Sequence, residues 1–177
     1  MKVVFVRHTS VEVPGGTAYG RSDVPLRASF PLEASVTRAC LAAYGLFDAA
    51  YTSPSTRCTR LADYCGYRGA TRDERLMEID LGDWEMQRFD EIADPRMELW
   101  RADAFTTAAT RGESLADQYG RVRNFLEEML KTDHEQVVVF THGGVIACAR
   151  IFSGEISVEE ALDREIAYGG VFEMDLD

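Results

Sequence analysis

Lysine is scarce in this 177-residue sequence: Lys2 and Lys131 are the only lysines among 19 basic residues, and the others are arginines. The net charge is −11, because 30 acidic residues outnumber the bases. A negative field of this kind repels nucleic acid and anionic lipid, so neither is expected as a partner. An anionic small molecule would need a local cationic pocket, and the planar, forked donors of arginine suit phosphate.

Cysteine pairs and long apolar runs are also missing. The apolar run near the N-terminus is too short for a signal peptide, and no run approaches the ~20 residues of a membrane span. No H-E-x-x-H motif or clustered carboxylate–histidine spacing favours a metal centre. We therefore expect a cytoplasmic protein without a metal or cofactor. The cysteines show no C-x-x-C spacing and lie in apolar, helix-like segments, which predicts buried structural thiols: Cys40, Cys58, Cys65 and Cys148.

The length and composition predict one folded domain over residues 1–177. An apolar share of 46% and a charged share of 28% are ordinary for globular proteins. Two full domains would each be undersized, and no internal repeat or interdomain linker is found. Residues 95–112 are expected to form a cap segment. The sequence carries no signal of oligomeric state.

Strand patterns alternate with helix patterns along the chain. Val3–Val6 and Gln136–Thr141 contain continuous β-branched and aromatic runs, typical of strands buried on both faces. Asp48–Thr52 is a shorter candidate, and the alternation over Phe172–Leu176 predicts a strand with one wet face. The order predicts a mostly parallel sheet with helices on both sides. Apolar spacing predicts those helices over 32–47, 55–65, 88–103 (as two short pieces), 115–129 and from 143 onward.

Two helix starts and one buried helix face are predicted in more detail. Ser53 followed by Pro54 is typical of an N-cap with proline in the first helical position. Ser114, with Asp117 three residues later, resembles a capping box. The helical stripe of segment 32–47 consists of Leu32, Val36, Ala39, Cys40, Ala43 and Phe47.

Three strand-to-helix junctions carry the polar side chains that suggest chemistry. In open α/β sheets, ligands collect beyond the carboxyl ends of the strands, where helix N-termini offer free amides to anions. Two histidines that each end a buried strand favour a functional pair, because unpaired imidazoles are costly in a core. His134, on a polar turn, is expected to be merely solvated. The junctions are Arg7-His8-Thr9, Ser53 to Arg57, and Thr141-His142-Gly143-Gly144.

Four motifs in order resemble those of the histidine phosphatase superfamily, the phosphoglycerate mutase-like group. Each motif is weak alone, and the series spans residues 3 to about 150. The resemblance implies a three-layer α/β/α sandwich with a mostly parallel sheet and an antiparallel edge strand. The motifs are Val-Arg7-His8-Thr9, Thr-Ser53-Pro54-x-x-Arg57, Leu-Met-Glu78-Ile-Asp-Leu-Gly82-Asp-Trp84-Glu85 and Thr141-His142-Gly143-Gly144.

The resemblance also implies roles for individual residues. His8 would be the nucleophile and Glu78 the general acid, with Glu85 as a rival seven residues downstream. Arg7, Arg57 and His142 would form a phosphate clamp, with Ser53 and amides near Gly143 as further contacts. His8 must present an unprotonated ring nitrogen, which neighbouring arginines favour because they oppose an imidazolium. Its other nitrogen is expected to bond a backbone carbonyl.

Two positions depart from the family pattern. Thr9 stands where the family commonly has glycine, and Pro14 replaces an asparagine that often follows the histidine. One phosphate contact is therefore missing or is supplied by Thr9, Ser10 or a backbone amide.

Two further segments resemble the α-ribazole phosphatase branch, which acts late in cobalamin assembly: Tyr19–Leu26 and Arg111–Ser114. The substrate would then be α-ribazole 5′-phosphate, a small phosphate ester. Alternatives are a phosphohistidine-protein phosphatase, a sugar-phosphate phosphatase of the same family, or a phosphate-binding module without catalysis. Aromatic residues that could stack on the benzimidazole are Tyr19, Phe30, Trp84, Trp100 and Phe105.

Overall fold

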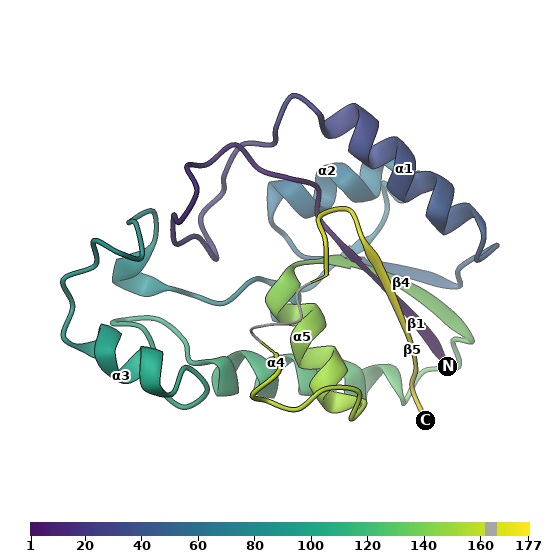
Figure 1. The fold of residues 1–177 in the computed structure, drawn as a ribbon. Coiled ribbons are helices and arrows are strands. Elements are labelled where there is room, and N and C mark those ends of the chain that lie inside the picture. Colours follow the sequence, from purple (N-terminus) through teal and green to yellow (C-terminus); the bar gives the residue numbers. More distant parts are fainter. Residues whose placement is uncertain (162–165) are drawn as a thin grey trace.

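The central element is a twisted sheet in the order β3-β2-β4-β1-β5 (Figure 1). The computed structural model describes residues 1–161 and 166–177. Four strands run parallel, and β5 pairs antiparallel with β1 at one edge. This confirms the predicted sheet. The strands are β1 (Lys2–Arg7), β2 (Ala49–Thr52), β3 (Thr71–Arg72), β4 (Gln136–Thr141) and β5 (Val171–Asp175).

Helices cover both faces of this sheet, as expected for a three-layer α/β/α sandwich. On one face lie α1 (Phe30–Ala42) and α2 (Thr56–Tyr64), and on the other lie α4 (Leu115–Met129) and α5 (Gly143–Phe152) (Figure 1). Two single turns of 3₁₀ helix, η1 (Glu74–Leu76) and η2 (Gly82–Trp84), interrupt the segment after β3. Among the described residues, no helix combines the length and apolar character needed to span a bilayer.

The buried strand β1 explains the two-sided core. Val3 and Phe5 pack toward α4 and α5, whereas Val4 and Val6 pack toward α1 and α2, and all four are fully buried. Each such side chain contributes about 1.5–3 kcal/mol when it leaves water. The sheet is therefore anchored from both sides at the strand that ends in Arg7.

The predicted cap of α4 is present, whereas that of α2 is shifted. Ser114 accepts from the amide of Asp117, and the Asp117 side chain accepts from the amide of Ser114. In α2 the N-cap residue is Ser55, so Pro54 lies outside the helix. Ser53 Oγ instead accepts a hydrogen bond from the Ser55 amide, at 3.3 Å.

The predicted core face of the first helix is wrong. The helix begins at Phe30, two residues earlier than expected, and ends at Ala42. Leu32 and Val36 are 70% and 59% exposed. Cys40 is exposed too, which contradicts its prediction as a buried thiol, and Cys65 is only half-buried. The face that packs on the sheet consists of Phe30, Ala34, Thr37 and Leu41.

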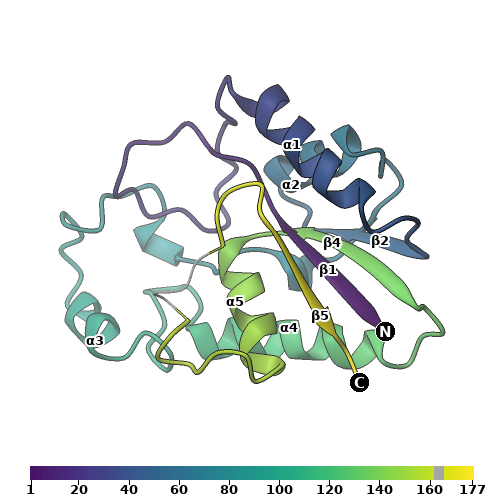
Figure 2. The same ribbon diagram turned by 45° about the vertical axis from the view of Figure 1, so that its right-hand side comes forward.

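The expected cap segment 95–112 contains one helix, α3 (Arg96–Ala102), rather than two helical pieces over 88–103. Figures 1 and 2 show α3 apart from the sheet layers, on the side toward which β1 runs. Met97 and Ala109 join Trp84 in a small apolar cluster of their own. The Trp84 indole also donates to Asp94 Oδ2, at 2.8 Å.

Candidate active site

The register between β1 and β4 places the two predicted histidines side by side. Arg7 pairs with Thr141, and the next amide, that of His8, donates to the Thr141 carbonyl at 3.0 Å. The ring centroids of His8 and His142 are 5.3 Å apart, edge to face. Both rings are buried. The carboxyl ends of two parallel strands therefore meet at one pair of imidazoles.

His8 is held as a neutral ring with one nitrogen available. Its Nδ1 lies 2.8 Å from the Thr9 carbonyl, which can only accept, so Nδ1 carries the proton and Nε2 has a free lone pair. The pKa of His8 is lowered to about 3, mainly by burial and next by the positive charge of Arg57. The hydrogen bond to Thr9 opposes this shift, and the charge of Arg7 adds a smaller lowering. The backbone carbonyl predicted as its orienting acceptor is thus present.

His142 lies deeper and has both ring nitrogens engaged. Arg57 Nε donates to its Nδ1 at 3.3 Å, so Nε2 carries the proton and donates to Ser53 Oγ at 2.8 Å. Burial, with the charge of Arg57, holds the pKa of His142 well below its usual value. Ser53 therefore contacts the second imidazole, and neither residue lines the cavity described below.

The two clamp candidates among the arginines come from different strand ends. Arg57 is fully buried in the first turn of α2 and donates to the carbonyls of Ser22 at 2.8 Å and Gly20 at 2.6 Å. Arg7 donates to the carbonyl of Ile166, and its guanidinium stacks on the Tyr168 ring, 4.2 Å from the centroid. Both charges contribute to the lowered pKa of His8. Only Arg7 of the two lines the cavity described below.

Glu78 and His8 line the same cavity. Its Oε1 accepts from the amide of Ile79 at 2.9 Å and from Gln118 Nε2 at 2.8 Å, and its Oε2 accepts from the amide of Gly144 at 3.1 Å. A Cβ at Gly144 would approach Glu78 Oε1 to 2.3 Å, so a larger residue there would require the Glu78 carboxyl group to move.

Glu85, the rival acid, has a different environment. Burial would raise its pKa, but hydrogen bonds from the Ser22 hydroxyl and from the amides of Gly20, Arg21 and Leu81 outweigh it and lower the pKa. A carboxylate held ionised in this way is a poor proton donor. It also does not line the cavity. Of the two carboxyl groups, only that of Glu78 lines the cavity.

A cavity of about 350 Å³ opens from His8, Arg7 and Glu78 toward α3. Of the aromatic residues predicted to line a substrate pocket, Tyr19 and Trp100 do so. Phe30 and Trp84 belong to buried clusters, and Phe105 packs against the main core. The Trp100 Nε1 is buried without a hydrogen-bond partner in the part of the chain that the structure describes. The apolar wall consists of Ile79, Leu81, Phe89, Trp100, Ala104 and Leu115.

The residues suggested for the missing family contact lie away from this cavity. Thr9 Oγ1 is buried and, within residues 1–161 and 166–177, has no hydrogen-bond partner. The Ser10 hydroxyl donates to Glu33 Oε1 at 2.5 Å, and Pro14 is exposed. Gly143 does not line the cavity, but a Cβ there would lie 3.1 Å from the Arg7 guanidinium carbon, so the first turn of α5 passes close to that side chain.

Among the cavity-lining residues that sequence reasoning missed are Phe89, Gln118 and Tyr168. Gln118 lies three residues after Leu115, where α4 begins. It is a polar residue on the buried side of that helix, and this pattern could have indicated a functional side chain. Tyr168 lies in the turn before β5, where no pattern indicated proximity to β1. Among the described residues, no group of three His, Cys, Asp or Glu side chains is placed to hold a metal ion.

The α/β/α sandwich with this polar edge is the phosphoglycerate mutase-like fold class, and the comparisons agree. Residues 3–177 match the histidine phosphatase superfamily (branch 1), and the chain belongs to this superfamily. A protein named phosphoserine phosphatase 1, from Hydrogenobacter thermophilus, is 30% identical over 147 residues, which cover 78% of this chain and 69% of the relative. The family and this relative identify the chain as a phosphoric monoester hydrolase.

Solved structures share the fold at lower identity. The α-ribazole phosphatase from Shigella flexneri has a TM-score of 0.86 at 21% identity, covering 100% of this chain and 91% of that chain. A mycobacterial glucosyl-3-phosphoglycerate phosphatase has a TM-score of 0.82 at 23% identity, covering 98% and 89%. These two neighbours establish the architecture.

Proposed function

We propose that this phosphatase hydrolyses a small phosphate monoester through a phosphohistidine intermediate on His8. The observation that carries the proposal is the His8 tautomer: Nδ1 is tied to the Thr9 carbonyl, and Nε2 is left as a neutral nucleophile beside Arg7 and Glu78. A buried imidazole with a lowered pKa does not need to lose a proton before it attacks at neutral pH.

In the first step, His8 Nε2 forms a bond to phosphorus while the bond from phosphorus to the ester oxygen breaks. Arg7, which lines the cavity, would neutralise charge on the non-bridging oxygens, and Arg57 would add its positive charge from its buried position. Neutralising this charge is the main demand of phosphoryl transfer. Glu78 would give its proton to the departing oxygen, so that an alcohol leaves rather than an alkoxide. Both ring nitrogens of His142 are engaged, so we assign this residue to holding Arg57 in the clamp.

In the second step, water attacks the phosphorus of phosphohistidine, and the bond from phosphorus to Nε2 breaks. Glu78, now a carboxylate, would accept the proton of the water molecule and return to its starting state. His8 is regenerated as a neutral ring because Nδ1 keeps its proton throughout. Ser53, Thr9 and the amide of Gly143, which the sequence also suggested as phosphoryl contacts, do not line the cavity, so the proposed steps do not use them.

We propose α-ribazole 5′-phosphate, an intermediate of cobalamin assembly, as the substrate. The cavity volume of about 350 Å³ suits a small organic ligand, and its apolar wall with Phe89 and Trp100 suits a flat aromatic group. The unpartnered Trp100 Nε1 could donate to an acceptor on the same ligand. Segment 95–112, which supplies Trp100 and Ala104, would then act as the cap that selects the leaving group.

Phosphoserine is the second candidate, because the relative from Hydrogenobacter thermophilus carries that activity in its name. An amino acid leaving group needs partners for an ammonium and a carboxylate. Among the described residues, Arg7 and Glu78 are the only arginine, lysine or acidic side chains that line the cavity, and both are assigned to the reaction. The lining therefore favours the aromatic ester over phosphoserine.

The decisive experiment compares kcat/KM on α-ribazole 5′-phosphate, phosphoserine, glucose 6-phosphate and a phosphohistidine peptide. A preference for the first by tenfold or more, about 1.4 kcal/mol, supports the substrate assignment, and a preference for any other replaces it. Rapid quench should trap a phosphorylated protein that is acid-labile, base-stable and labelled in the N-terminal peptide. His8→Ala should give neither label nor turnover. Tight phosphate binding by the wild type without turnover would instead indicate a binding module.

A further inference from the structure

The proposed acid, Glu78, is held by a side chain from another layer of the fold. Segment 73–85 has little regular structure of its own, apart from the single turns η1 and η2. The position of the Glu78 carboxyl group must therefore be fixed by neighbours. Two of its three donors are backbone amides, and the third is Gln118 Nε2 at 2.8 Å.

Gln118 is unusual for α4 because it is a polar residue on the buried face. Its side chain is 1% exposed, and its helical neighbours on that face are apolar, Leu115 and Val122. A buried amide that found no partner would cost about 1–3 kcal/mol. The hydrogen bond to Glu78 offsets that cost. Oε1 of Glu78 accepts two hydrogen bonds, whereas Oε2 accepts one, so Oε2 keeps an unused lone pair.

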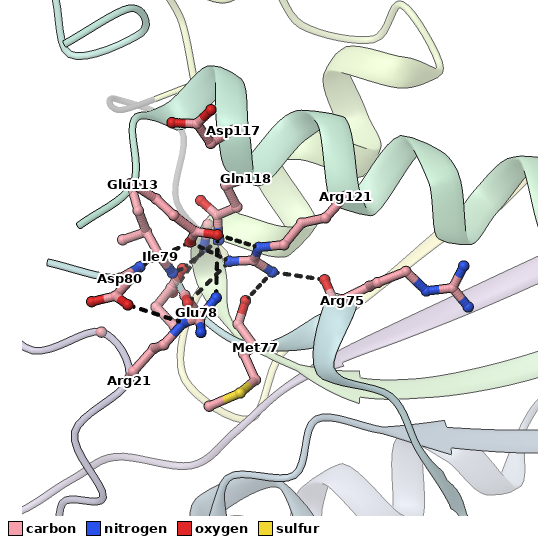
Figure 3. Close-up of polar contacts among 12 residues, drawn as sticks. Arg21, Arg75, Met77, Glu78, Ile79, Asp80, Glu113, Asp117, Gln118 and Arg121 are labelled. Carbon is pink, nitrogen blue, oxygen red and sulfur yellow. Dashed lines mark hydrogen bonds and ion pairs between the residues drawn. The ribbon is translucent and has the colours of Figure 1, made fainter. Parts of the chain in front are cut away.

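The next turn of α4 holds the backbone of the same segment. Arg121 Nη1 donates to the carbonyls of Arg75 at 2.7 Å and Met77 at 2.6 Å, and Nη2 donates to that of Glu78 at 3.0 Å. The same guanidinium pairs with Glu113, whose carboxylate accepts from the Asp80 amide. Figure 3 shows Gln118 and Arg121 reaching from one face of α4 to the Glu78 segment.

We propose that Gln118 is a positioning residue for proton transfer: it holds Oε1 of Glu78 so that Oε2 delivers the proton to the leaving oxygen. This inference rests on the proposed function. Arg121 fixes the main chain beneath Glu78, and Gln118 fixes the carboxyl group. Gln118 itself does not touch the phosphoryl group in this scheme. Its loss should therefore harm only reactions in which the leaving group needs a proton.

Comparing the hydrolysis of two phosphate esters of similar size distinguishes this positioning role of Gln118 from a purely structural role. The nitrophenolate released from p-nitrophenyl phosphate is stable without a proton, whereas the alkoxide of benzyl phosphate must be protonated as it leaves. For both esters, kcat/KM depends only on the steps up to departure of the leaving group. The later attack of water on phosphohistidine therefore does not affect kcat/KM. General acid catalysis contributes roughly 10²- to 10⁴-fold, and a misplaced donor forfeits part of that factor.

Gln118→Met keeps the volume of the side chain and removes its hydrogen bonds. We expect kcat/KM for benzyl phosphate to fall by about tenfold or more and that for p-nitrophenyl phosphate to fall less than about threefold. Retained activity on the second ester shows that the variant is folded. Gln87→Met is the matched control, because Gln87 is exposed and bonds only a carbonyl outside the cavity. It should leave both values unchanged.

An equal loss on both esters would overturn the proposal, because it would mean that Gln118 only supports the fold or the phosphate site. An unchanged kcat/KM for benzyl phosphate would overturn it as well. If wild-type protein turns over neither ester nor the substrates compared above, the proposed function fails instead, and that result is distinct from either outcome for Gln118.

Discussion

The hydroxyl groups of Tyr19 and Tyr168 lie 2.7 Å apart and join two loops that are 149 residues apart in the chain. The Tyr168 ring also lies 5.5 Å from that of His8 and stacks on the Arg7 guanidinium, and Tyr19 approaches the guanidinium of Arg57 to 5.6 Å. The pair therefore places two phenol rings, joined by one hydrogen bond, against His8, Arg7 and Arg57. Both rings line the cavity, as does Glu78.

Replacing Tyr168 should separate the contribution of its ring from that of its hydroxyl group. Tyr168→Ala removes the ring from Arg7, and a cation–π contact of about 1 kcal/mol corresponds to a rise in KM of about fivefold with little change in kcat. Tyr168→Phe keeps the ring and should stay within about twofold of wild type. Steady-state kinetics on p-nitrophenyl phosphate measures both. Equal KM values for the two variants would show that the stacked ring does not hold Arg7.

Arg57 should tolerate no conservative replacement. Its guanidinium donates to His142 and to two carbonyl groups, and the compact ammonium of Arg57→Lys cannot reproduce this forked geometry. We expect kcat/KM to fall by about 10²-fold or more and the free energy of unfolding to fall by about 1–3 kcal/mol. Arg60→Lys, on the exposed side of the same helix, is the control. Similar losses in the two variants would contradict the assignment.

The lowered pKa of His8 predicts a specific pH dependence of stability. The folded ring titrates near pH 3 and the unfolded ring near 6.5, so below pH 6.5 the unfolded state binds more protons and is favoured. The contribution of neutral, buried His8 to the free energy of unfolding is therefore complete above pH 6.5 and is lost as the pH falls toward 3. Wild type should therefore lose about 1.4 kcal/mol per pH unit more than His8→Asn between pH 6 and 4.5.

Denaturant unfolding of the two proteins at several pH values measures this difference. Carboxylates with lowered pKa values also destabilise the fold in acid, but they are common to both proteins and cancel in the comparison. Parallel stability curves would mean that His8 titrates equally in the folded and unfolded states.

A single methyl group at Gly144 should disable proton transfer. The Cβ of Gly144→Ala would lie 2.3 Å from Glu78 Oε1 and 2.9 Å from Gln118 Oε1, so the carboxyl group must move. We expect kcat/KM for benzyl phosphate to fall by about 10²-fold, with an overpacking cost of about 1–3 kcal/mol in stability. Gly120→Ala is the matched control, since open space surrounds that position in α4, and it should stabilise the protein by about 0.5–1 kcal/mol. Wild-type activity of Gly144→Ala would show that Glu78 is not the acid.

The sheet and its histidine pair could be predicted from the sequence because their signals are local and strong. Val3–Val6 and Gln136–Thr141 are apolar on both faces, and parallel strands of that kind must neighbour each other in a covered sheet. The junction residues then follow at one edge, so His8, His142 and Arg57 were identified without coordinates. The structure brings these three residues together, and their catalytic roles are proposals.

Other features depend on tertiary contacts that leave little trace in the sequence. The first helix offers two apolar stripes, and the one with Phe30 and Leu41 packs on the sheet because Thr37 can bond the Gly169 carbonyl there, at 2.8 Å. Gln118, which bonds the Glu78 carboxyl group, lies 40 residues later. The apolar residues of its helix already accounted for the helical periodicity, so Gln118 did not stand out. No sequence pattern relates that helix to an irregular segment.

The bond from the His8 amide to the Thr141 carbonyl extends the ladder of the two innermost strands. We therefore expect the proposed nucleophile to be displaced only by global unfolding. The amide of His8 should be among the slowest to exchange with deuterium. Tyr19 and Trp100 instead reside on loops and on α3, outside the layers. Residues proposed to select the substrate can therefore change during evolution while the proposed nucleophile stays fixed.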